Sequence, residues 1–222
     1  TFVVASGDVL ADIDIGALYD YHKKKKAMAT MALTKVKDPT DFGIVGLDKD
    51  DRIVRFLEKP KKEEVFSNLI NAGIYVLEPE ILDYIPAGQM YDFSKQVFPA
   101  LLKDNKPLYG RAVEGVWRDI GKPHDLLQAS LDIVEKEGQK MELDKVKTKG
   151  KIMLGKNCAI EKGVKIIGPA YIGDDVYISA GSVIERSCIY GNVFIDRDAK
   201  IEDSIILDGS KVGWQTQISD SV

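Results

Sequence analysis

The chain has 222 residues, of which 45% are hydrophobic and 30% charged, and its 31 basic and 35 acidic side chains give a net charge of −4. This composition is typical of a globular protein of one large or two modest domains and excludes disordered and collagen-like classes. No basic excess is present to bind nucleic acid, and no apolar run reaches the roughly 18 residues that cross a bilayer. The two cysteines exclude a disulfide scaffold and favour a reducing compartment, so we predict a cytoplasmic protein.

The first part of the chain alternates strand and helix patterns. Apolar or alternating runs predict strands at residues 2–5, 27–36, 44–47, 52–57, 72–77 and 108–113. Caps, Pro at the first helical position or a 3.6-residue apolar spacing predict helices after Asp14, after Pro79, at 93–102 and at 123–137. Strands that alternate with helices predict an α/β fold whose mixed sheet carries helices on its faces.

A different pattern begins after about residue 150. Aliphatic side chains recur every six positions, and a small or compact residue stands four positions after each of the first six of them. The aliphatic positions are Leu154, Ile160, Ile166, Ile172, Ile178 and Ile184, then Ile189, Ile195 and Ile201 after a slip of one residue, then Ile206, Val212 and Ile218 after another. This hexad repeat is typical of a parallel β-helix with the aliphatic residues inside, although a β-sandwich with fortuitous spacing is the alternative.

Two further expectations follow from this change of pattern. The polar, Lys-rich stretch before the hexads predicts a domain at 1–140, a linker at 141–150 and the β-helix at 151–222. Cys158 and Cys188 occupy the small positions of the hexads, so we expect both to point inward as inert packing residues.

Two carboxylates follow predicted strands and are candidates for a metal site. Asp8 ends the turn Ser6-Gly7-Asp8, and Asp119 lies between a strand and the helix that begins at Pro123. Ligands of open α/β sheets bind beyond the carboxyl ends of strands, and two carboxylates together with phosphate oxygens suit Mg²⁺. Taken singly, each aspartate also fits an ordinary turn.

Two further segments are candidates for substrate binding. Glu58 and Lys59 end a strand, where the carboxylate can accept hydrogen bonds from sugar hydroxyls and the ammonium can bind a phosphate. Asn71 and Gly73 begin the next strand, and a glycine there lets a ligand approach the backbone. The alternative for Glu58 and Lys59 is a plain surface turn.

Together these segments resemble a known family. The motifs are Gly7-Asp8, Phe42-Gly43, Glu58-Lys59-Pro60, Asn71-Ala72-Gly73-Ile74-Tyr75 and Trp117-Arg118-Asp119-Ile120-Gly121. In this order and spacing they resemble the sugar-1-phosphate nucleotidyltransferases, or NDP-sugar pyrophosphorylases, several of which carry a C-terminal left-handed β-helix. The resemblance therefore implies a Rossmann-like nucleotidyltransferase domain followed by a left-handed β-helix.

The resemblance also implies roles for single residues. Asp8 and Asp119 match the aspartates that hold the catalytic Mg²⁺, and Lys59 matches the lysine that contacts the sugar phosphate. Gly43, Glu58, Asn71 and Gly73 match positions that contact the sugar. The two histidines match nothing in the family; we expect His22 on a solvated helix face beside four lysines, and His124 opens a helix that can lie near the site.

One family feature is missing from the 222 residues. Members of the family carry a glycine-rich loop, GGxGTRLxPLT, that binds the nucleotide, and no such segment occurs here. We therefore expect a partial catalytic domain that is inactive alone, belonging to an enzyme that transfers a nucleotidyl group from a nucleoside triphosphate to a sugar-1-phosphate and releases pyrophosphate. The alternatives are a regulatory or assembly subunit that binds nucleotide sugars and a hexapeptide-repeat acyltransferase. We also expect a homo-oligomer, while the sequence specifies neither the sugar nor the base.

Overall fold

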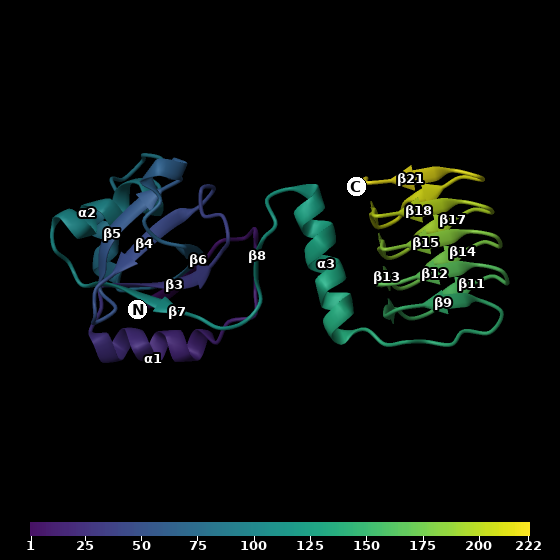
Figure 1. The fold of residues 1–222 in the computed structure, drawn as a ribbon, viewed down its shortest axis with the longest axis horizontal. Helices are drawn as coiled ribbons and strands as arrows, with labels where there is room; N and C mark the ends of the chain where they lie inside the picture. The colour runs from purple at the N-terminus through teal and green to yellow at the C-terminus, as the bar shows by residue number, and fades with distance from the viewer. The chain divides into compact units, whose positions relative to one another are not determined.

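The computed structural model describes residues 1–222, which form two compact units, Thr1–Asp119 and Ile120–Val222 (Figure 1). No helix in it combines the length and the apolar character that a bilayer crossing requires. The predicted domain limits of 1–140, 141–150 and 151–222 remain a prediction. The division into compact units differs from them in one respect, because it groups the helix at Pro123–Glu137 with the second unit.

The first unit is built on a mixed sheet of order β5-β4-β6-β3-β7, with β1 paired to β6. Its strands are β1 (Phe2–Ala5), β3 (Ala29–Lys35), β4 (Gly43–Leu47), β5 (Ile53–Glu58), β6 (Leu69–Leu77) and β7 (Leu108–Ala112). All pairs are antiparallel except β3 with β7, which confirms the mixed sheet. A separate antiparallel ribbon joins β2 (Val9–Ala11) to β8 (Trp117–Asp119).

Helical segments cover both faces of this sheet because side chains alternate across its strands. On one face, Leu18 of α1 (Ile15–Lys25) packs against Ala32 of β3. On the other, Phe98 of α2 (Phe98–Lys103) packs in one core with Met31. The remaining segments are the 3₁₀ turns η1 (Lys62–Glu64) and η2 (Pro79–Tyr84) and the π-turn η3 (Phe93–Val97). Asp14 caps α1 as predicted, since its carboxylate accepts a 2.8 Å hydrogen bond from Ala17 N.

Three local expectations need correction. The apolar run at 2–5 forms the predicted strand, but its composition does not make it a buried one, since Val3 is 45% exposed and β1 has only β6 as a neighbour. The three-residue strand β2 was not predicted, since so short a run carries no periodicity. The expected helix at 93–102 divides into the π-turn η3 and the α-helix α2.

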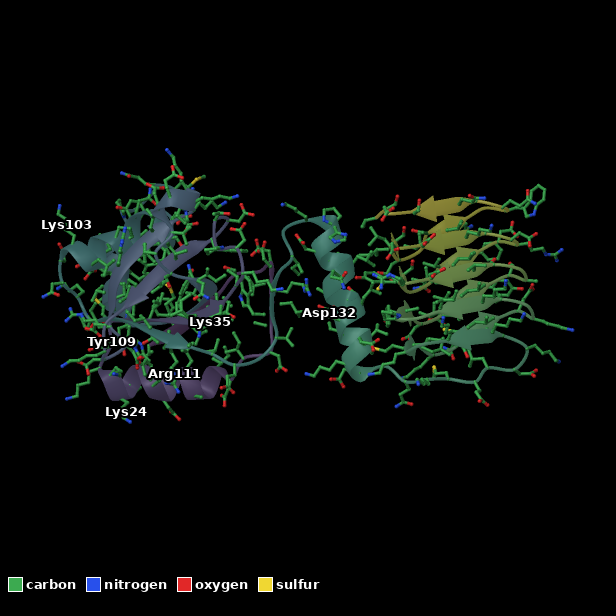
Figure 2. All side chains as sticks on the ribbon, viewed as in Figure 1. Lys24, Lys35, Lys103, Tyr109, Arg111 and Asp132 are labelled. Atoms are coloured by element: carbon green, nitrogen blue, oxygen red, sulfur yellow. The ribbon has the colours of Figure 1, made fainter.

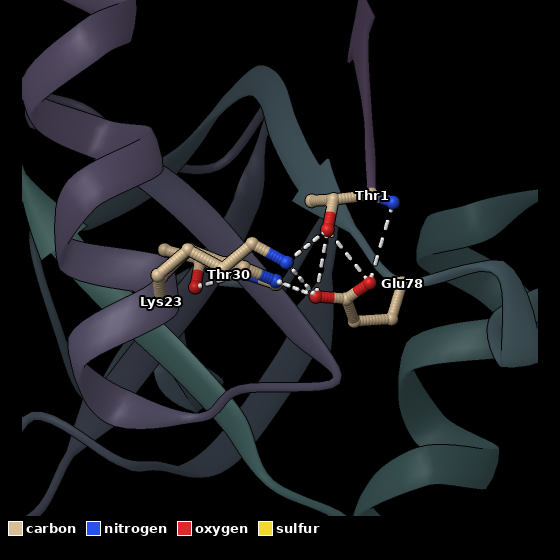
Figure 3. A network of polar contacts seen from close by, with 5 residues as sticks. Thr1, Lys23, Thr30 and Glu78 are labelled. Carbon is tan, nitrogen blue, oxygen red and sulfur yellow. Dashed lines mark hydrogen bonds and ion pairs between the residues drawn. The ribbon is translucent and has the colours of Figure 1, made fainter.

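His22 is a further correction, since it is fully buried and does not lie on a solvated face. It follows Leu18 by four positions and therefore shares that residue's inward face of α1. Its Nδ1 lies 2.9 Å from Thr30 Oγ1 and its Nε2 lies 3.2 Å from Glu78 Oε1 (Figure 3). Lys23 Nζ donates to the same Glu78 oxygen at 2.6 Å, whereas Lys24 projects outward from the helix (Figure 2).

The second unit contains a parallel β-helix of three ladders, as the hexads predicted (Figure 1). One ladder comprises β10 (Ile152–Leu154), β13 (Ala170–Ile172), β16 (Cys188–Ile189) and β19 (Ile205–Ile206). The second comprises β11 (Ala159–Ile160), β14 (Tyr177–Ile178), β17 (Phe194–Ile195) and β20 (Lys211–Val212). The third comprises β9 (Lys147–Lys149), β12 (Lys165–Ile167), β15 (Val183–Glu185), β18 (Lys200–Glu202) and β21 (Gln217–Ser219).

The interior of the β-helix holds the predicted aliphatic residues. Ile166, Ile172, Ile178 and Ile184 are fully buried, and Ile160 packs against the same core while partly exposed. The slips in the hexad period keep this register, since Ile172 still pairs with Ile189 in the next coil. Its left-handed sense remains a prediction.

Cys188 is buried, but not inside the β-helix as expected. The slip before Ile189 turns Cys188 outward, where it packs with Ile205 against Leu127 and Leu131 of α3 (Pro123–Glu137). Burial raises the pKa of the Cys188 thiol to about 11, which fits an inert packing role. Cys158 packs against the β-helix interior as expected, and burial raises its pKa as well.

Candidate functional site

A bulge in β6 forms the floor of the candidate site. Leu33 of β3 pairs with Asn71 and Met31 pairs with Tyr75, so Ala32 alone faces the three residues Ala72–Ile74. Gly73 adopts a φ of +73°, and a Cβ at this position would stand 2.8 Å from Ser6 Oγ. Glycine is therefore required here both by conformation and by space.

Three hydrogen bonds hold the bulge in place. The Asn71 side-chain carbonyl accepts from Gly73 N at 2.9 Å, and the Gly73 carbonyl accepts from Ser6 N at 2.9 Å. The Trp117 indole Nε1 donates to the Ala72 carbonyl, also at 2.9 Å. The bulge is thus tied to the two segments that carry Asp8 and Asp119.

The ribbon of β2 and β8 brings these two segments side by side. Val9 pairs with Asp119 in its register, so Asp8, one residue earlier, stands next to the position opposite Asp119. Asp8 is exposed and Asp119 is half-buried. Two carboxylates are hard oxygen ligands, and Mg²⁺ is typically held by one or two protein carboxylates plus substrate phosphates, so this donor set fits the predicted ion.

Gly43 and Glu58 face each other across the hairpin of β4 and β5. A Cβ at Gly43 would lie 2.6 Å from Glu58 Oε2 and 2.7 Å from Phe56 Cζ, so glycine leaves room for the carboxylate. Burial raises the pKa of Glu58, the Asp92 carboxylate raises it further, and the Lys59 and Lys95 ammonium groups oppose the rise. Glu58 is therefore a half-buried acceptor beside two cations.

Lys59 directly follows this acceptor in an unusual backbone conformation. Its φ is +47°, and its N–H donates to the Phe42 carbonyl at 3.0 Å. The ring of Phe42 in turn contacts the Trp117 ring edge-to-face, with centroids 5.5 Å apart. This contact connects the Gly43, Glu58 and Lys59 group to the bulge and to β8.

Sequence reasoning missed the segment that packs beside Asn71. Asn71 Nδ2 donates to Tyr75 Oη at 2.8 Å and to Ser94 Oγ at 3.2 Å, so its amide is engaged by the protein on both sides. Asp92 caps the π-turn by accepting from Lys95 N at 2.9 Å. The sequence does contain a signal for this turn, because Asp92 precedes the apolar run that begins at Phe93, but the spacing of that run predicts only a helix.

The first unit therefore brings together all seven predicted site residues in three connected groups: Asp8 with Asp119, Asn71 with Gly73, and Gly43 with Glu58 and Lys59. What each residue binds stays a prediction. His124 lies exposed at the start of α3, in the second compact unit.

Comparison with known proteins yields two family matches. Residues 1–136 match the nucleotidyl transferase family, and residues 148–222 match the GMPPB C-terminal domain.

Individual relatives agree with these matches. The chain is 34% identical over 227 residues to a UTP–glucose-1-phosphate uridylyltransferase of Synechocystis, covering 93% of this chain and 58% of the relative. It is 35% identical over 203 residues to a mannose-1-phosphate guanylyltransferase of Mycobacterium tuberculosis, covering 91% and 55%. A probable mannose-1-phosphate guanylyltransferase 1 of Oryza sativa is 32% identical over 222 residues, covering 98% and 58%. The chain thus spans a little over half the length of these curated relatives.

Proposed function

The chain belongs to the nucleotidyl transferase family, and on this basis we propose that it forms the sugar-1-phosphate side of an active site. The proposed reaction transfers a nucleotidyl group from a nucleoside triphosphate to a sugar-1-phosphate and releases pyrophosphate, as a step of nucleotide-sugar biosynthesis. The observation that carries the proposal is that one unit holds all seven predicted residues in three groups, which the β6 bulge, the β2–β8 ribbon and the Phe42–Trp117 contact connect. The printed activities of the relatives agree with this reaction.

The chemistry requires alignment and charge compensation more than proton transfer. The second pKa of a phosphate monoester is about 6, so the attacking oxygen of the sugar phosphate is already anionic at neutral pH. No general base is needed, and both histidines are indeed engaged elsewhere or exposed in the other unit. In this scheme Lys59 offsets the charge of the attacking phosphate, and Glu58, Gly43, Asn71 and Gly73 line the sugar position.

Asp8 and Asp119 are the residues that would hold Mg²⁺. The bound ion supplies neutralisation of phosphate charge and a fixed geometry for displacement at phosphorus. The chain contributes the β2–β8 ribbon, whose register places Asp8 next to the position opposite Asp119.

Three further features belong to the proposal. The free state of both cysteines supports a cytoplasmic location. Sugar-1-phosphate and nucleoside triphosphate are the proposed small-molecule partners. We also propose a homo-oligomer, supported by the exposed Tyr177–Phe194 ring stack on a flat ladder of the β-helix.

Binding of a sugar-1-phosphate is the direct test, because the 222 residues contain no glycine-rich nucleotide loop and little turnover is expected from them. We expect mannose- or glucose-1-phosphate to shift amide signals around Asn71, Gly73 and Glu58 in ¹H–¹⁵N NMR titrations. Lys59→Met should weaken binding about tenfold or more, since a charge-assisted hydrogen bond contributes ~1.5–3 kcal/mol.

Matched controls are available for this titration. Lys103→Met changes an exposed lysine on α2 (Figure 2) and should leave the affinity unchanged. Unphosphorylated mannose should bind to the wild-type chain and to the Lys59→Met variant with the same affinity. A wild-type chain that shows no shifts in this region with either sugar phosphate would contradict the proposed function.

A further inference from the structure

Trp117 lies on the same short strand as Asp119, and its side chain binds the β6 bulge. Its indole Nε1 donates to the Ala72 carbonyl at 2.9 Å, and its ring packs with the cluster of Leu18, Ala32 and Ala72. Two positions later in the same short strand stands Asp119. Because side chains of a strand repeat their direction every second residue, Trp117 and Asp119 belong to the same face of β8.

Ser6 corresponds to Trp117 in the segment that carries Asp8, because it also binds the bulge. Its N–H donates to the Gly73 carbonyl at 2.9 Å, two residues before Asp8. Adjacent carbonyls of one bulge, those of Ala72 and Gly73, thus bind the segments of both aspartates. The ribbon of β2 and β8 is short, with three residue pairs in register, and these two bonds join it to the bulge of the main sheet alongside the apolar packing of Ala11 and Trp117.

We propose that Trp117 is a positioning residue for the metal-binding pair, acting through its N–H···O bond to the Ala72 carbonyl. This bond fixes the height and rotation of β8 over the bulge, and thereby the place of the Asp119 carboxylate relative to Asp8. The inference rests on the proposed function in one respect, namely that these two aspartates bind a divalent cation. It goes beyond that function by assigning a role to the indole N–H of Trp117, whose partner is a backbone carbonyl of the bulge.

The ring of Trp117 and its N–H group are separable by substitution. Trp117→Phe keeps an aromatic ring and removes the donor, while Phe42→Leu removes the ring that contacts Trp117 and keeps the N–H···O bond. An isosteric replacement is also available, since the only other tryptophan is Trp214, which is 64% exposed. In a Trp214→Phe background, benzothienylalanine in place of tryptophan exchanges the N–H for sulfur at position 117 alone.

The experiment measures Mn²⁺ binding to the full 222-residue chain, by electron paramagnetic resonance of the free ion and by line broadening of the Val9 and Asp119 amides. We expect Asp119→Asn to abolish binding at this place. Loss of one neutral hydrogen bond, worth roughly 0.5–1.5 kcal/mol, predicts about a twofold to tenfold weaker affinity for Trp117→Phe and for the benzothienyl chain. Phe42→Leu should stay within about twofold of wild type, and ¹H–¹⁵N spectra verify that each variant is folded.

The possible outcomes distinguish the role of Trp117 from the existence of the metal site. Mn²⁺ affinity that is unchanged in both the Trp117→Phe and benzothienyl chains, while Asp119→Asn abolishes binding, would overturn the role of Trp117 and leave the metal site standing. A wild-type chain that broadens neither Val9 nor Asp119 would overturn the metal site and the role of Trp117 together. Equal weakening by Phe42→Leu and Trp117→Phe would show that general packing, rather than the N–H bond, determines affinity.

Discussion

Glu78 connects the lysine-rich end of α1 to the interior of the first unit. Hydrogen bonds, above all from Lys23, hold the pKa of its carboxyl at about 2, below the ordinary 4.5. Its Oε1 also lies 3.2 Å from Nε2 of the buried His22 (Figure 3). Burial lowers the pKa of His22 from 6.5, although Glu78 opposes this shift. In the folded state Glu78 therefore favours its ionised form and His22 its neutral form, which are the forms expected at neutral pH.

The sign of the pH dependence follows from these directions. Below pH 6.5 His22 binds a proton more readily in the unfolded chain than in the folded chain. The folded state therefore loses stability as the pH falls. We expect the free energy of unfolding of the first unit to decrease between pH 7.5 and 5.5, by at most about 1.4 kcal/mol per pH unit from this group. Glu78 adds a loss of the same sign only below its ordinary pKa of 4.5.

Urea unfolding followed by NMR signals of Thr1–Asp119 measures this dependence. His22→Gln removes the titrating ring and should flatten the slope between pH 7.5 and 5.5, from a lower starting stability. His124→Gln replaces the exposed histidine of α3 and should retain the wild-type slope. Identical slopes for wild type and His22→Gln would disprove the assignment to His22.

Single residues of the site differ in how far the sequence reveals them. Asp8, Glu58 and Asp119 are acidic residues at strand ends, and such positions can be recognised from the pattern alone. Trp117 and Ser94 act through hydrogen bonds to partners distant in sequence, Ala72 and Asn71, and no local pattern encodes such pairs. The prediction of a solvated His22 was wrong because it relied on the four neighbouring lysines. The four-residue spacing from Leu18 was the better indicator, since it places both residues on one face of α1.

At the level of elements, helix α3 shows how an amphipathic pattern is used. Its boundaries agree with the predicted 123–137, and its buried side chains repeat at helical spacing. Leu127 and Leu131 cover Cys188 and Ile205 on the outside of a β-helix ladder. This ladder therefore has apolar residues on both sides, which the hexad pattern alone does not predict.

The contribution of this contact to stability can be measured. Leu131 is 1% exposed, so Leu131→Ala should destabilise the second unit by about 2–5 kcal/mol, the usual range for a buried leucine. Ile133, on the same helix, is 40% exposed, and Ile133→Ala should cost less than about 1 kcal/mol. Chemical denaturation monitored by circular dichroism compares the two variants. Equal losses would mean that α3 is not held by its Leu127–Leu131 face.

The bulge and the π-turn mark the limit of prediction for elements. The strand at 72–77 was predicted, but β6 begins at Leu69 and contains two more residues than its partner between Asn71 and Tyr75. Such an insertion depends on the register between two strands, which a single sequence does not contain. The hexads were predictable for the opposite reason, since each coil repeats the same local pattern.

On the scale of the whole molecule, the proposed association of two copies relies on one flat ladder of the β-helix. Tyr177 and Phe194 pair in register on β14 and β17, are 37% and 39% exposed, and stack with centroids 5.4 Å apart. Exposed aromatic side chains on a flat surface are typical of protein interfaces.

We expect sedimentation equilibrium to give a mass above that of the monomer, and Phe194→Ser to shift it toward the monomer. Leu207→Ser changes another exposed apolar residue, 49% exposed and outside the regular strands, and should leave the mass unchanged. A monomeric wild-type chain at all concentrations tested would contradict the proposed association.

The two tryptophans provide each compact unit with its own fluorophore. Trp117 belongs to Thr1–Asp119, where it is partly buried and hydrogen-bonded, and Trp214 belongs to Ile120–Val222, where it is 64% exposed. The first should therefore emit at shorter wavelength than the second, and iodide should quench the second preferentially. Emission at the two ends of the band then reports separately on the sheet unit and the β-helix unit, without any label attached to the protein.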